Sequence, residues 1–384
     1  MPLTQLNFQP GIDTENTPTG AESKWIDCDK IRFRKGLPQK IGGWTKFSTG
    51  YYVGVGRALE QWFALDGGRY EALGTDRKLY VYAAGTNQDI TPIRSTDALT
   101  NAISTTSGSN IITIMDTGHG ASQGDFVTLS NVTATVGGIP AATLDAEYEI
   151  LTISNTDAYT IQSSATANAN VAPTANCTAT YQISIGPSVQ TFGFGWGSGT
   201  WNTGTWGTAR SSSNVILDAR LWSISNWGED LIITQKDGAT YEWNLSAGMT
   251  NNRCTAVANA PSNSTLSMVS TETRHVVCLG TETEIGNTAS QDKMFIRWSD
   301  QENYNQWSPN VVNSAGSQRI GGGSEIRCAK PAKGTMLVWT DTTMQSMSFI
   351  GPPLIFGFRQ LGNDCGAVGL NSAIVVDDVA YWMS

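Results

Sequence analysis

Histidine and charged side chains are scarce in this sequence of 384 residues. There are only two histidines, His119 and His275, and charged residues make up 15% of the chain, against about 25% in a typical globular domain. Because histidine is a common metal ligand and general base, this scarcity argues against a metal centre and against most acid–base catalysis. We therefore expect no bound metal, no cofactor and no enzymatic activity.

Paired cysteine motifs and long apolar runs are also missing. The six cysteines are widely spaced and contain no Cys-x-x-Cys pair, so we expect buried, reduced thiols and not a disulfide framework. No apolar run approaches the ~18 residues of a membrane-spanning helix. The first residues lack the basic start and apolar stretch of a secretory signal. We expect no stable insertion into a membrane.

The short motifs of common active sites are absent as well. The sequence has no Gly-x-Ser-x-Gly elbow and no phosphate-binding loop of the Gly-x-x-x-x-Gly-Lys type. Cys278 follows His275 by three residues, and this spacing in a strand places the two side chains on opposite faces. We therefore do not expect them to act as a nucleophile and its base.

Threonine, serine, asparagine and glycine are abundant, while the helix-favouring Glu, Lys and Arg are few. This composition is typical of strands joined by tight turns. The hydrophobic fraction of 40% is ordinary for a protein with a packed core. The sequence therefore predicts an all-β fold.

One long segment has no positive charge. After Arg94 the next Lys or Arg is Arg210, and the gap holds seven of the 33 acids. Short β-branched runs separated by turn signals within it predict a small β-sandwich or barrel, inserted at residues 93–188. We expect six acids at the surface of this insert: Asp116, Asp125, Asp145, Glu147, Glu149 and Asp157.

A strand–turn–strand pattern recurs on both sides of the insert. The copies lie at residues 71–82, 231–243, 294–307 and 336–349. Such repeats predict a propeller-like platform of β-hairpin blades, formed by residues 1–92 (an N-terminal segment and the first blade) and 189–384 (the remaining blades). Two packed sandwiches are the alternative. The last hairpin, residues 373–384, lacks a continuation, so either a partner chain completes it or the natural protein is longer.

Three tryptophans, Trp196, Trp201 and Trp206, recur every five residues in a stretch rich in glycine. A period of five fits neither a strand nor a helix, so we expect a loop. One interpretation is a platform on which sugars or bases stack. The other is a loop whose indoles pack into a neighbouring blade or subunit.

Near the start, Arg32 and Arg34 alternate with apolar residues, which predicts a half-buried strand with one basic face, followed by Lys35. This face is either a solvated surface or a contact with an acidic patch on an adjoining subunit.

The same opening segment resembles the tail hub or nozzle proteins of short-tailed bacteriophages, also called tail tubular protein B. The similarity includes Gly-Trp-Gly repeats and the stretch Gly137-Gly138-Ile139-Pro140 in the insert. Members of this family are usually longer than this chain. The matching positions of the opening motif are Trp25, Asp27, Asp29, Arg32, Phe33, Arg34, Gly36, Pro38, Lys40, Gly42, Gly43 and Trp44.

The resemblance implies a structural protein of the virion tail, assembled in the host cytoplasm. It implies a homo-oligomeric ring, a hexamer, that extends the tail channel, contacts an adaptor or tail tube ring and tail fibres, and conducts DNA during ejection. The subunit-interface candidates are Arg32, Arg34, Lys35, Trp196, Trp201 and Trp206.

We hypothesise that the channel wall is acidic or neutral, because Lys and Arg would hold the DNA by its phosphates. The alternative function is a glycan-binding or sialidase-like propeller. Sialidases have Asp-containing hairpin turns, and the stretch 234–241 is faintly similar to one.

Overall fold

The computed structural model describes residues 9–43, 45–46, 50–65, 67–186, 191–192, 216–217 and 219–384. The chain divides into two compact units, Met1–Thr49 and Gly50–Ser384. Apart from one helical turn, α1 (Ala141–Leu144), and two 3-10 turns (Leu245–Ala247 and Thr288–Ser290), the described elements are β-strands. The all-β prediction is confirmed.

The first unit contains one antiparallel pair, β1 (Ile31–Arg34) and β2 (Leu37–Lys40). The turn between them has positive φ at Lys35 (52°) and Gly36 (81°), as in the tight two-residue turns that join hairpin strands. Among the described residues of this unit, Ala21 is the one buried hydrophobic side chain. The hairpin therefore has little core of its own, and an isolated two-stranded hairpin is marginally stable at best.

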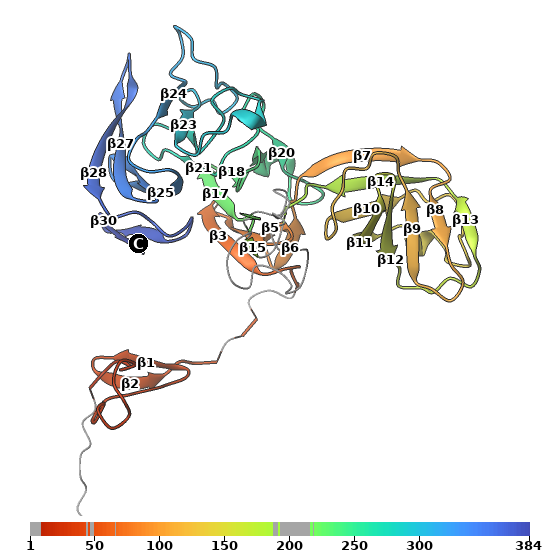
Figure 1. Ribbon diagram of the computed structural model, residues 1–384, viewed down its shortest axis with the longest axis horizontal. Helices are drawn as coiled ribbons and strands as arrows, with labels where there is room; N and C mark the ends of the chain where they lie inside the picture. Colours follow the sequence, from red (N-terminus) through yellow and green to blue (C-terminus); the bar gives the residue numbers. More distant parts are fainter. Residues whose placement is uncertain are drawn as a thin grey trace, which may run out of the picture. The chain divides into compact units, whose positions relative to one another are not determined.

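The platform in the second unit consists of four four-stranded antiparallel sheets, each a meander in chain order (Figure 1). A two-stranded hairpin follows them, and the short strands β15 (Thr191–Phe192) and β16 (Ile216–Leu217) pair separately. The strands of the first two sheets are β3 (Gly56–Phe63), β4 (Arg69–Thr75), β5 (Leu79–Ala83), β6 (Thr86–Asp89), β17 (Trp222–Trp227), β18 (Asp230–Gln235), β19 (Thr240–Trp243) and β20 (Thr255–Ala256). Those of the third and fourth sheets and of the last hairpin are β21 (Leu266–Val269), β22 (Val276–Leu279), β23 (Phe295–Trp298), β24 (Gly316–Arg319), β25 (Ile326–Ala332), β26 (Thr335–Thr340), β27 (Thr343–Gly351), β28 (Ile355–Asn363), β29 (Ala373–Val376) and β30 (Val379–Trp382).

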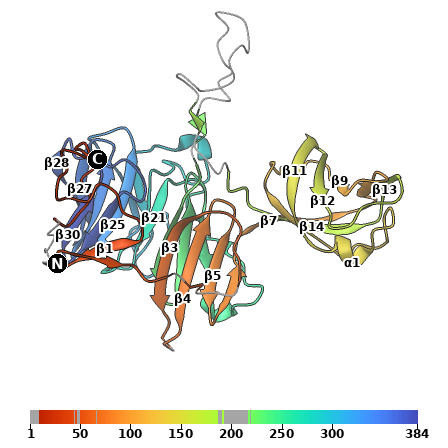
Figure 2. The ribbon, with the colours of Figure 1, turned by 90° about the horizontal axis from the view of Figure 1, so that it is seen from below.

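Neighbouring sheets meet through their first strands. Strand β17 contacts β3 on one side and β21 on the other, and β25 contacts both β21 and β29. Figure 2 shows β3, β4 and β5 of the first sheet side by side. First strands that face a common centre are the arrangement of propeller blades. This confirms the propeller-like platform, and the hairpins expected from the sequence correspond to β4–β5, β18–β19, β23 with the loop after it, and β26–β27.

The turn between the second and third strands is built alike in the first and fourth sheets. The hydroxyl oxygens of Thr75 and Thr340 each accept a backbone N–H three residues further on, at 2.8 Å. The next residue, Asp76 or Asp341, accepts the N–H of the segment that enters the first strand of the same sheet, at 2.7 and 2.9 Å. In the second sheet, Asp237 pairs instead with Lys293, in the segment just before β23 of the third sheet. Each of these recurring aspartates thus connects its turn to another segment of the platform.

In chain order, the insert lies between the first and second blade-like sheets. Its strands run from Ile93 to Gln182. They form one eight-stranded antiparallel sheet in the order β13-β8-β9-β12-β11-β10-β14-β7. Strand β11 pairs with β10 through its first residues and with β12 through the rest, with two register shifts, so it belongs to both halves of the sheet. The strands are β7 (Ile93–Leu99), β8 (Ile103–Thr105), β9 (Ile111–Met115), β10 (Phe126–Ser130), β11 (Glu147–Asn155), β12 (Ala158–Gln162), β13 (Val171–Thr174) and β14 (Cys177–Gln182).

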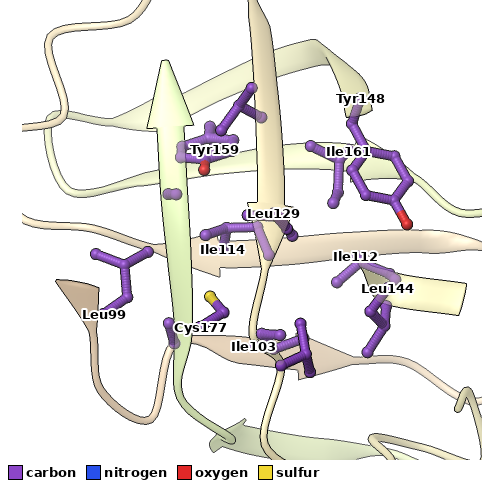
Figure 3. Packing of buried hydrophobic residues seen from close by; sticks show 14 of the residues in the cluster. Leu99, Ile103, Ile112, Ile114, Leu129, Leu144, Tyr148, Tyr159, Ile161 and Cys177 are labelled. Carbon is purple, nitrogen blue, oxygen red and sulfur yellow. The ribbon is translucent and has the colours of Figure 1, made fainter. Parts of the chain in front are cut away.

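A single hydrophobic core fills the insert, and seven of its eight strands contribute buried side chains. Figure 3 shows several of these side chains packed together. Ile112, Ile114 and Ile161 are fully buried there. Strands β7, β8 and β13 and helix α1 were not predicted, because β8, β13 and α1 have only three or four residues and β7 has a run of four polar residues, 94–97, in its middle.

We predict that Gly74→Ala destabilises the platform. A Cβ at Gly74 would lie 2.5 Å from Cδ1 of Trp222, which belongs to the next sheet. Overpacking of this kind costs roughly 1–3 kcal/mol. Urea unfolding should show this loss, whereas the control Gly321→Ala, which has nothing within 4 Å of the added atom, should unfold like the wild type. Equal stability of both variants would contradict the tight contact.

Candidate functional site

A cleft of about 700 Å³ lies where the first strands of the four blade-like sheets converge. Its walls come from β3, β17, β21 and β25 and from the loop before β29. In that loop, the side-chain amide of Asn371 donates to the backbone oxygen of Arg57 at 3.1 Å. This hydrogen bond joins the last part of the platform to its first strand and closes the wall of the cleft.

Charged groups in the cleft lining are mainly cationic. They are Arg57, Arg274 and Lys330, with Glu60 as the acid. Arg274 lies over the ring of Trp227, 4.7 Å from its centroid, and pairs with a glutamate outside the lining at 3.1 Å. Burial raises the pKa of Glu60, and the positive charge of Lys330 partly offsets this effect. Lys330 and Glu60 therefore influence each other, although they belong to the fourth and the first sheet.

Hydroxyl groups complete the lining of the cleft. Glu60 is the only carboxylate among the lining residues. Cations beside hydroxyl groups are suited to holding an anion. The hydroxyl residues in the lining are Ser223, Ser225, Ser267, Ser270 and Thr271.

The interface candidates predicted from the sequence lie partly on the first unit. Arg32 and Arg34 are exposed on β1, while Ile31 and Phe33, on its other face, are less exposed, as the alternation predicted. Lys35 occupies the turn after β1. Whether these residues form a subunit contact stays a prediction. The other three candidates lie outside the described residues: Trp196, Trp201 and Trp206.

The acidic residues of the insert are not all at its surface. Asp116 and Asp125 are buried, so the predicted surface position is wrong for these two. Asp116 accepts a hydrogen bond from the hydroxyl of Tyr181 at 2.5 Å. Asp125 accepts the backbone N–H of Ser122 at 2.8 Å, and burial raises the pKa of Asp125. The remaining four are exposed: Asp145, Glu147, Glu149 and Asp157.

Two of the exposed acids contact the platform. Glu149 pairs with Arg77 at 3.0 Å, and Glu147 pairs with Lys78 at 2.5 Å. Both cations lie in the turn between β4 and β5 of the first sheet. The side chain of Lys78 is 3% exposed and also pairs with Asp89 at 2.9 Å. The negative charge of the insert is therefore partly neutralised where the insert contacts the first sheet.

Asp89 is the second centre of this network. It pairs with Arg253 at 2.8 Å, and the amide of Gln182 donates both to Asp89 (3.2 Å) and to Glu147 (2.6 Å). Burial alone would raise the pKa of Asp89, but Lys78 and Arg253 outweigh it and lower the pKa. Of this network the sequence pointed only to Glu147, as a surface acid, because its partners Lys78, Asp89, Gln182 and Arg253 lie far from it along the chain.

His275 and Cys278 are both fully buried but do not contact each other's functional atoms. The His275 ring nitrogens lie 2.8 Å from the hydroxyl of Thr273 and 3.0 Å from that of Ser314. The thiol of Cys278 lies 3.5 Å from the hydroxyl of Thr240. Burial lowers the pKa of His275 to about 4 and raises that of Cys278 to about 11. These shifts are opposite to those that activate a thiol nucleophile.

The six cysteines are free, with Cys28 and Cys365 partly exposed and the others buried. Within the described ranges, no group of three or more His, Cys, Asp or Glu residues is placed to hold a metal ion. In the same part of the chain, no helix has the length and apolar character needed to cross a membrane.

The chain has little similarity to known proteins. No protein-family model matches the chain, and no curated protein sequence matches it. Among solved structures, a phage phi92 endosialidase is similar at 12% identity and a TM-score of 0.23, over 79% of this chain and 43% of that one. This chain therefore spans less than half the length of that protein. A TM-score this low supports no conclusion about function.

We predict that Lys78→Met destabilises the protein, because it leaves Asp89 and Glu147 without their shared cation. The loss should be roughly 2–3 kcal/mol, below that of a fully buried pair since Glu147 is partly exposed. Lys333→Met is the matched control, because the side chain of Lys333 is 84% exposed. Thermal and urea unfolding of the two variants check this. A Lys78→Met protein as stable as the control would show that the network does not hold the fold.

We also predict that His275 makes stability depend on pH. Below pH ~6.5 the unfolded state binds a proton that the folded state, with a His275 pKa of about 4, does not bind. The free energy of unfolding should therefore fall as the pH drops from ~6.5 to ~4, by up to roughly 3 kcal/mol. Urea unfolding of the wild type and of His275→Gln at several pH values isolates this contribution. The same pH dependence in both proteins would exclude it.

Proposed function

We propose that this protein is a hub or nozzle subunit in the tail of a short-tailed phage. Copies of it assemble into a ring that extends the tail channel and conducts DNA during ejection. The resemblance of residues 25–44 to that family supports the proposal, as does a platform made of blade-like sheets. The main observation in favour of the proposal is that the first unit is a basic hairpin with almost no core of its own.

The first unit is a basic hairpin with almost no core. Its exposed residues include Arg32 and Arg34 on β1 and Leu37, which is 70% exposed, on β2. Because an isolated two-stranded hairpin is marginally stable, contact with a larger surface would stabilise this unit. A subunit contact supplies such a surface.

Charge makes a second copy of this chain a suitable partner. Residues 1–49 hold seven of the 24 bases and five of the 33 acids, a net charge of +2, so residues 50–384 carry −11. Complementary charges steer association and select the correct partner. We propose that the basic face of β1 in one copy binds an acidic surface of the next copy.

The proposed ring also encloses the DNA path. We propose an acidic or neutral wall, because a wall rich in Lys and Arg would retain the DNA through its phosphates. This path lies between copies and is distinct from the cleft inside one chain.

Electron microscopy and mass photometry of the purified protein test the proposal. We expect rings that dissociate as the salt concentration rises. The double variant Arg32→Glu/Arg34→Glu should weaken assembly about tenfold or more, because it reverses two charges on β1. The control Lys333→Glu/Arg359→Glu reverses two exposed charges on the second unit and should assemble like the wild type.

Two outcomes would refute this function. One is a strictly monomeric protein that turns over a saccharide, which would favour the sialidase-like alternative. The other is ring assembly that the two reversals on β1 leave unchanged, which would remove the role of the basic face.

A further inference from the structure

We infer that the cleft between the blade-like sheets binds a small anionic sugar, one that carries a carboxylate or a phosphate beside its hydroxyl groups. Ring assembly does not require such a ligand, so this inference goes beyond the proposed function and can fail without it.

The charge of the cleft is the first argument. The chain as a whole carries −9, yet the lining holds three cations and one acid. Arg274 already has an aromatic ring and a carboxylate as partners. Lys330 is half-buried, and in the described part of the chain no carboxylate lies within ion-pair distance of it. A partly buried cation that influences Glu60 but forms no ion pair with it is poorly neutralised, and a bound anion would stabilise it further.

The hydroxyl groups are the second argument. Ser267 is 3% exposed, and its Oγ has no hydrogen-bond partner among the described residues. Its backbone N–H donates to the hydroxyl of Ser223 at 2.9 Å, so both residues belong to one polar wall. Buried hydroxyl groups in proteins normally have a partner, which a ligand or a water molecule can supply. A lining that holds five hydroxyl residues and three cations is complementary to a sugar that carries one negative group.

The size of the cleft limits the ligand further. A volume of about 700 Å³ falls within the range of sites for small molecules. Four first strands and the loop before β29 form the walls, and a cleft of this volume suits one or two sugar units. The negative group could be the carboxylate of a sugar acid in a surface glycan or the phosphate of a sugar phosphate, and both present the same chemistry to Lys330.

Isothermal titration calorimetry with the full chain tests the inference. The probes are glucuronate and glucose 6-phosphate, with glucose as the neutral control and inorganic phosphate as the anion without a ring. We expect saturable binding of at least one charged sugar that weakens as salt is added. The tighter of the two probes identifies the negative group. Absence of binding by both, or equally tight binding of inorganic phosphate, would overturn the inference.

Variants locate the site. Lys330→Gln should weaken binding of the charged sugar about tenfold or more, because a charge-assisted hydrogen bond is lost. Lys330→Arg keeps the charge and should bind within a few-fold of the wild type. Lys333→Gln, in the turn after β25, removes the same charge outside the cleft and should bind normally.

Thermal unfolding of each variant shows whether it is folded. If Lys330→Gln does not fold, the comparison of Lys330→Arg with the wild type remains valid. Unchanged affinity in folded Lys330→Gln, or an equal loss in Lys333→Gln, would refute the assignment of the site to the cleft.

Discussion

The platform depends on the packing of the first strand of each sheet against the first strands of its neighbours. Trp222 of β17 adds a contact with β4, the second strand of the first sheet: its indole N–H donates to the backbone oxygen of Thr75 at 2.8 Å, and its ring occupies the space above Gly74. No helix covers these sheets in the described part of the platform, apart from the two 3-10 turns. The order of the sheets and the cleft at their centre both follow from the contacts between first strands, β3 with β17, β17 with β21 and β21 with β25.

The sequence predicted the features that depend on neighbours along the chain. Alternating apolar residues and tight turns identified hairpins such as β4–β5 and β26–β27, and the gap in positive charge identified the insert. What it missed depends on residues far apart. Asp116 is buried because Tyr181, 65 residues away, donates to it, and Lys78 meets Glu147 across 69 residues. The cleft is assembled from four sheets, so no local pattern could indicate it.

Net charge turned out to be a poor guide to local chemistry. The insert is acidic in composition, yet two of its acids lie in hydrogen bonds inside the fold and two others pair with cations of the first sheet. In the same acidic chain, the first unit is basic, and the cleft lining holds more cations than acids. Interactions with a partner or a ligand depend on the charge of these local surfaces, which the net charge of −9 does not reveal.

The hydrogen bond from Asn371 to Arg57 connects residues that are 314 positions apart. Contacts between such distant segments are costly in chain entropy, and chains dominated by them fold slowly. The side of the cleft that β3 forms is therefore completed only after almost the whole chain has been synthesised. The insert has its own core built from nearby strands, so we expect it to fold earlier and to hold β6 and the ends of the first sheet in place while the rest of the platform follows.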